Sequence, residues 1–224
     1  MPRPGAERSF RIQNVRSVPL PADLTTAARI RNAALALFAE HGPEATSVRA
    51  VAAAAGTSAP SVIRIFGSKE KLVEAVDDHV VGRIGEMLDA FVASADRDDA
   101  RSLMQAVVNE PDLLGYLIRA LTGGGVAGDV LFDRLYDISM SFLEQMEAAG
   151  VARPVADKAA TVVWLMAADM GVLLLRRHLV RALGIDPFTP AGMDRIAAVE
   201  LDLMTQTYLT FPGAPPDDPM EAEI

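Results

Sequence analysis

Apolar residues recur every three to four positions along most of this chain, which is the spacing that places them on one face of an α-helix. The first clear stripe lies in residues 24–40, where Ile30, Ala34, Leu37 and Phe38 share one side. No segment keeps the strict alternation of apolar and polar residues that is typical of a half-buried strand, and no sequence period repeats. The pattern therefore predicts an all-α fold of about nine helices.

Prolines and glycines divide the later part of the chain into helices, because proline fits the first turn of a helix and glycine often follows the last. After residue 68 the stripes predict a long helix to about residue 94 and a short one at 103–108. Pro111 then opens a helix, and further helices are expected over about 131–150, 154–183 and 190–211.

Residues 46–72 carry two short helical patterns that are separated by a glycine turn at Gly56. Thr57 or Ser58 can cap the second of them. Two short helices joined by a tight turn are typical of a helix-turn-helix motif, whose second helix enters the major groove of DNA. The inward stripes are Val48, Val51, Ala52 and Ala55 in the first helix and Val62, Ile65 and Phe66 in the second.

The charge distribution supports this interpretation, although the net charge of the chain is −9. Residues 1–72 hold ten Lys and Arg against five Asp and Glu, a net +5, whereas residues 73–224 have a net −14. A basic front and an acidic back suit a small nucleic-acid-binding domain joined to a larger one. We expect a basic arm at 1–22, a DNA-binding domain at 23–72, a helical body at 73–213 and a disordered tail at 214–224.

A helical wheel predicts which side chains of the second motif helix face DNA. Its outward stripe is Thr57, Pro60, Ser61 and Arg64. Arg64 can recognise guanine or contact a phosphate, and Thr57 and Ser61 can bond to base edges. At the start of the first motif helix, Thr46, Ser47 and Arg49 can hold a phosphate, because helix N-termini attract anions. One of the two hydroxyls is expected to serve only as a cap.

The segment GTSAPSVIRIFGSKEKL resembles the N-terminal domain of TetR-type transcriptional regulators. The residues at matching places are Gly56, Thr57, Ser58, Val62, Phe66, Ser68, Lys69, Glu70 and Leu72. The resemblance implies a phosphate contact for Lys69, in addition to the contacts expected of the two motif helices. Ser58, which can cap the second helix, also belongs to the DNA-binding candidates. The resemblance also implies a repressor that binds a palindromic DNA operator as a homodimer, which is built from the helices at 154–183 and 190–211.

The same resemblance implies that the body holds a pocket for a small effector, whose binding shifts the long connecting helix and releases DNA. Apolar candidates for the lining favour a hydrophobic effector of unknown identity; they are Met104, Tyr116, Phe142, Trp164, Met166 and Met170. Asp169 also belongs to the candidates, because an unpaired carboxylate inside an apolar run is costly. It needs a partner such as Arg176 or Arg119, or a polar cavity.

Other classes of protein find less support. The chain has no cysteine, and its three histidines are too scattered for a metal site, so we expect no enzyme, no cofactor and no metal. We also expect no membrane partner and a cytoplasmic location, because residues 1–20 lack an apolar signal core and the longest apolar run is too short to span a bilayer. The alternative is a helical interaction module without sequence-specific DNA binding. Ile63 and Ala59, which replace a tyrosine and a basic residue that are usual in the family, and the acidic body make it possible.

Overall fold

The computed structural model describes residues 25–94, 109–207 and 209. The described residues form nine helices and no strand beyond one isolated bridge between Ala152 and Leu209. The helices are α1 (Thr26–His41), α2 (Val48–Ala54), α3 (Ala59–Phe66), α4 (Lys69–Ser94), α6 (Pro111–Gly123), α7 (Val126–Ala148), α8 (Lys158–Leu174), α9 (Arg176–Leu183) and α10 (Pro190–Thr207). The predicted all-α class is confirmed.

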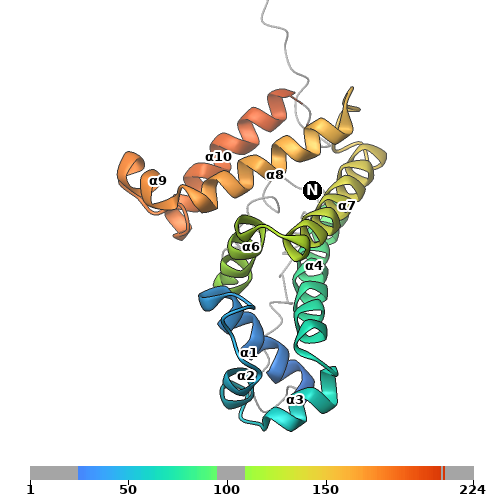
Figure 1. Cartoon of the computed structure of the whole chain (residues 1–224). Helices are drawn as coiled ribbons and strands as arrows, with labels where there is room; N and C mark the ends of the chain where they lie inside the picture. The colour runs from blue at the N-terminus through green and yellow to red at the C-terminus, as the bar shows by residue number, and fades with distance from the viewer. Residues whose placement is uncertain (1–24, 95–108, 208, 210–224) are drawn as a thin grey trace, which may run out of the picture.

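The molecule is elongated, with α1, α2 and α3 forming a head at one end (Figure 1). Helix α4 leaves the head and runs along the body, where α7 packs against it. Helices α8 and α10 cross the end of the body that is far from the head, and α9 projects from it. Helix α4 thus connects the head, which carries the DNA-binding candidates, to the body.

One hydrophobic core extends from the head into the body without a break. It includes Ile30 and Phe38 of α1, Val62 of α3, Val76 of α4 and Leu113 of α6, all of which are almost fully buried. About fifty residues of head alone would bury too little surface to be firmly stable. The head therefore depends on α4 and α6 for part of its stability.

Helix α6 is the second link between the head and the body, because it packs along α1. The guanidinium of Arg119 donates hydrogen bonds to the carbonyl oxygens of Ala39, at 3.2 Å, and Glu40, at 2.7 Å. These carbonyls belong to the last turn of α1, whose acceptors have no partner within the helix. Arg119 thus fastens α6 to the C-terminal end of α1.

The predicted helix over 154–183 is wrong in two respects. It begins at Lys158, after Asp157 has accepted a hydrogen bond from the amide of Ala160 as the cap, and it breaks at Leu175 with a bend of 74° into α9. The bend coincides with the change from apolar to basic sequence, and it lets Arg176 form two hydrogen bonds with Asp186. Within the described residues no single helix is long and apolar enough to cross a membrane, and the bent pair of α8 and α9 meets that test only jointly.

Most other predicted boundaries agree closely with the structure, although α7 begins at Val126 and not at about 131. The first helix, predicted at 24–40, is α1, and the helices opened by Pro111 and Pro190 are α6 and α10. The predicted count of nine included a helix at 103–108, which lies outside the described residues, and counted α8 and α9 as one. The arm at 1–22, the tail at 214–224 and Phe211 also lie outside them.

Candidate functional site

Two serines set the geometry of the helix-turn-helix. The hydroxyl of Ser47 accepts a hydrogen bond from the amide of Ala50 at 3.1 Å and caps α2, and that of Ser58 accepts one from the amide of Ser61 at 3.3 Å and caps α3. Between them Gly56 has φ of 63°, in the left-handed region that other residues rarely adopt. The caps and the glycine together fix the angle at which α3 leaves α2.

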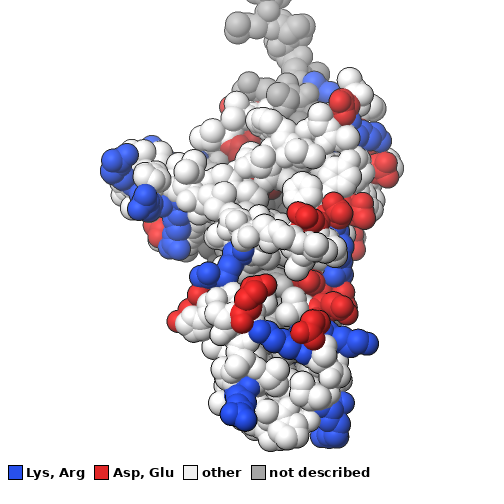
Figure 2. All heavy atoms as spheres, viewed as in Figure 1, with Lys and Arg blue, Asp and Glu red and all other residues white. Residues whose placement is uncertain are grey.

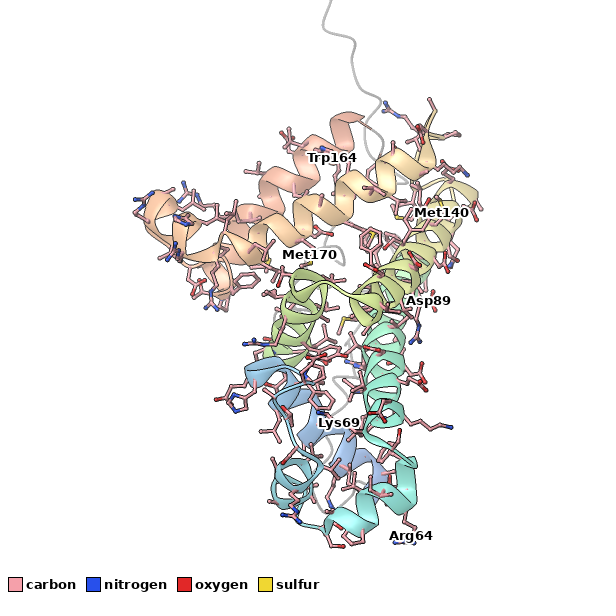
Figure 3. All side chains as sticks on the ribbon, viewed as in Figure 1. Arg64, Lys69, Asp89, Met140, Trp164 and Met170 are labelled. Atoms are coloured by element: carbon pink, nitrogen blue, oxygen red, sulfur yellow. The ribbon has the colours of Figure 1, made fainter. Side chains whose placement is uncertain are left out.

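Helix α3 has the two faces that the helical wheel predicts. Val62 is fully buried in the core. Pro60 and Arg64 are exposed on the other side, and Thr57 and Ser61 are partly exposed. In Figure 3, Arg64 lies at the tip of the head, away from the body. The outward stripe is therefore free to meet a duplex.

Three of the predicted phosphate contacts lie at the starts of α2 and α4. Ser47 and Arg49 are exposed at the start of α2. Lys69 begins α4, where its Nζ donates to the carbonyl oxygen of Glu44 at 3.2 Å. Thr46 differs from the prediction, because it is buried and its hydroxyl donates to the carbonyl oxygen of Gly42 at 2.8 Å. Its role is to close the turn between α1 and α2, so it leaves the set of DNA contacts.

The head carries an excess of basic residues, as the sequence predicts. Figure 2 shows blue side chains at the tip of the head, red and blue ones together over the junction, and a further blue group on α9. The described part of the head, residues 25–72, carries six Lys and Arg against three Glu. A DNA backbone would meet a weakly positive surface there and not the acidic body.

The body contains a cavity of about 360 Å³ that is partly open to solvent. Its walls come from α4, α6, α7, α8 and α10, with Pro187, Phe188 and Leu209 beside them. The lining is apolar except for Ser139, Asp169 and Glu200. A cavity of this size with a few polar groups is typical of a site for a small molecule.

Four of the predicted pocket residues line this cavity, and they are Phe142, Met166, Asp169 and Met170. Two others do not. Tyr116 is buried at the junction of α1, α4 and α6, where its hydroxyl donates to Asp77. Trp164 is 65% exposed on the outer side of α8. Met104 lies outside the described residues.

Asp169 faces the cavity and not an arginine. Arg176 is bound to Asp186, and Arg119 is bound to the end of α1, so neither of the proposed partners reaches it. Asp169 is exposed to the open space of the cavity, and the protein atoms around it weaken the hydration of its carboxylate. This desolvation, together with the negative charge of Glu200, raises the pKa of Asp169 to about 7.

Most of the other lining residues were not among the candidates, and Glu200 is the charged one among them. Burial raises the pKa of its carboxyl group as well. A signal was present, because Glu200 shares one face of the last helix with Met193, Ile196 and Met204, at helical spacing. A carboxylate in an apolar stripe of that kind needs the same explanation as Asp169.

Comparison with known proteins agrees with this architecture. The profile of the bacterial regulatory proteins of the tetR family matches residues 30–76, and that of the tetracyclin repressor-like C-terminal domain matches residues 109–210. The HTH-type transcriptional regulatory protein RaaS of Mycobacterium tuberculosis is 36% identical over 154 residues, which cover 69% of this chain and 72% of RaaS.

Solved structures share the fold at low identity. SmeT, the repressor of the Stenotrophomonas maltophilia multidrug efflux pump SmeDEF, is 22% identical, has a TM-score of 0.57, and matches over 87% of this chain and 97% of its own. The SmeT–triclosan complex gives the same identity and TM-score over 84% of this chain and 96% of its own.

The head, the body and the relatives together define a helix-turn-helix transcriptional regulator. This chain belongs to the TetR family of bacterial regulatory proteins. The family and the relatives above are regulators and not enzymes.

Proposed function

We propose that the protein is a repressor that binds a palindromic operator as a homodimer and is released from it by a small hydrophobic effector. The observation that carries the proposal is that α4 and α6 contribute both to the cavity and to the support of the head. The protein would act in the cytoplasm, where bacterial operators lie.

In this proposal α3 reads the major groove. Arg64 bonds to a guanine or a phosphate, Ser61 and Thr57 bond to base edges, and Pro60 contacts a thymine methyl group. Ser47, Arg49 and Lys69 bind phosphates, and Ser58 keeps its capping role at the edge of the interface. Phosphate contacts of this kind provide affinity and register, whereas base contacts provide the sequence preference.

A dimer is supported by the outer faces of α8 and α10. Val163 and Trp164 of α8 are exposed, and Val199 and Leu203 of α10 are each 58% exposed. Large apolar side chains gathered on the surface of one end of a protein are typical of an interface. A second copy that covers them would bring two heads to one duplex, and a two-fold dimer matches a palindromic site.

Release by an effector is supported by the two sides of α6. Leu114, Leu117 and Leu121 line the cavity, while Tyr116 and Arg119 hold α4 and the end of α1. A ligand that moves α6 or α4 therefore changes the position of the head. The SmeT–triclosan complex is a precedent on the same fold for a bound small molecule.

Selection of bound fragments from genomic DNA tests the proposal. We expect one enriched sequence with two-fold symmetry, bound with an affinity that falls steeply as salt concentration rises. An apolar compound that fills the cavity should release it. Failure to enrich any sequence would contradict the proposal and would favour the alternative, a helical interaction module that does not recognise specific DNA.

A further inference from the structure

The charge of the cavity is of one sign. Asp169 from α8 and Glu200 from α10 both belong to its lining, and no Lys, Arg or His does so within the part of the chain that the structure describes. The two carboxylates are close enough for the charge of Glu200 to act on Asp169. A space with apolar walls therefore holds two acidic groups and no counter-charge.

Among residues 25–94, 109–207 and 209, no hydrogen-bond donor and no cation acts on either carboxylate. Asp77 shows the contrast, because this carboxylate is buried and accepts a hydrogen bond from Tyr116 at 2.6 Å. Unpaired acidic groups in apolar surroundings are costly, and a protein that keeps two of them in one cavity gains from any positive group that enters.

We propose that the effector is an organic cation with a bulky apolar body, whose positive charge lies between Asp169 and Glu200. This inference rests on the proposed function and names the chemical class of the effector. A neutral effector would leave both carboxylates without a partner, and an anionic one would be repelled by them.

The walls of the cavity suit such a molecule. The rings of Phe91 and Phe142, with centroids 5.8 Å apart, both belong to the lining, and aromatic faces attract cations as well as apolar groups. Met166 and Met170 stand near Asp169 on α8, and methionine adapts to ligands of different shape. The apolar body of the effector would thus contact the aromatic and methionine side chains, and its charge would lie at the two carboxylates of the same cavity.

The test compares two ions of nearly equal size and shape but opposite charge, tetraphenylphosphonium and tetraphenylborate. Binding is measured by calorimetry on the full-length protein and on Asp169→Asn, Glu200→Gln and the double variant. Asp133→Asn is the control, because Asp133 is exposed on α7 and does not line the cavity. Binding of the neutral dye Nile red reports whether the cavity of each variant is intact.

We expect the wild-type protein to prefer the phosphonium ion, and each single variant to bind it roughly tenfold more weakly. The double variant should lose the preference, while Nile red binding and the control stay unchanged. The inference is overturned if tetraphenylborate binds as tightly as the phosphonium ion, if neither ion binds, or if the preference survives in the double variant with Nile red still bound.

The outcome is separable from that of the proposed function. If a neutral apolar compound releases the operator while the phosphonium ion does not bind, the repressor proposal stands and only the class of effector is wrong. If the phosphonium ion binds but the operator is not released, the site is right and the repressor proposal fails.

Discussion

The hydroxyl of Tyr116 donates a hydrogen bond of 2.6 Å to Oδ1 of Asp77, which joins α6 to α4 in the buried junction between head and body. Burial raises the pKa of Asp77, and the hydrogen bond from Tyr116 opposes that rise. On the same helix the adjacent Leu117 lines the cavity. The bond is therefore one polar contact through which movement of α6 would be passed to α4, beside the ion pair between Arg83 of α4 and Glu110 at the start of α6.

Tyr116→Phe should destabilise the protein by about 1–3 kcal/mol, because it leaves the carboxylate of Asp77 buried without its donor. Urea unfolding at pH 7 measures the loss. Asp77→Asn with Tyr116→Phe completes a double-mutant cycle, and an interaction energy of zero would contradict the role of the bond. If the bond also transmits the effector signal, Tyr116→Phe should need more effector to release DNA.

Gly128→Ala should destabilise the protein by about 1–3 kcal/mol, because α7 lies against α6 at this residue. A Cβ atom there would stand 2.6 Å from the carbonyl oxygen of Ala120, which is backbone and cannot rotate away. Gly82→Ala in α4 is the matched control, since its Cβ would meet nothing within 4 Å. Alanine favours a helix over glycine, so this control should be neutral or up to about 1 kcal/mol more stable. If Gly128→Ala and Gly82→Ala changed the temperature of thermal unfolding equally, the close packing of α6 and α7 would be contradicted.

Asp169 should make stability depend on pH near neutrality. Its pKa is about 7 in the folded protein, above the ordinary value of 3.8, so between these values the folded state binds more protons than the unfolded one. Stability should therefore fall as pH rises from about 4 through 7. Asp169→Asn should flatten that slope and be the more stable protein at pH 8, by on the order of 1 kcal/mol after allowance for the open cavity.

The measurement is chemical unfolding at several pH values between 5 and 8 with the ligand-free protein. Among the described residues, Glu200 is the other titratable group that acts on Asp169, so Glu200→Gln should lower the pKa of Asp169 and shift the slope to lower pH. An unchanged slope in Asp169→Asn would show that the carboxylate is hydrated in the folded state.

Leu203→Lys should convert a dimer into monomers, because it places a charge on the exposed apolar face of α10 that we assign to the interface. Trp164→Lys on α8 should act in the same way. Val126→Lys is the control, as Val126 is 78% exposed at the start of α7. Sedimentation velocity distinguishes the two states. If the wild-type protein is a monomer at micromolar concentration, or if Leu203→Lys stays dimeric, the assignment of this face is wrong.

The sequence was most informative where helical spacing alone determines which side chains are buried. The wheel of α3 needed only the period of a helix to separate Val62 from Arg64, and the structure agrees. The bend at Leu175 could not be predicted, because the helical pattern continues across it and the contact between Arg176 and Asp186 is tertiary.

The candidate pocket was harder to predict for a related reason. Helix α8 is apolar on nearly every side, so periodicity could not tell whether Trp164 or Met166 faces inward. Tyr116 is a predicted pocket residue, yet it lies in the junction between head and body, and the adjacent Leu117 lines the cavity. Thr46 was assigned to DNA because a hydroxyl at a helix start suits a phosphate, and the structure gives it a backbone carbonyl instead.

The central claim is that α3 reads duplex DNA with Arg64 at its exposed face. The most direct measurement is the binding of the selected operator and of its single-base variants to Arg64→Ala, beside Arg181→Ala, which removes an exposed arginine of α9 at the other end of the molecule. We predict that Arg64→Ala costs about 1–3 kcal/mol and relaxes the preference at one position of each half-site if the contact is to a base, or weakens all sequences alike if it is to a phosphate. Arg181→Ala should change neither. Unaltered affinity and preference in Arg64→Ala would contradict the account.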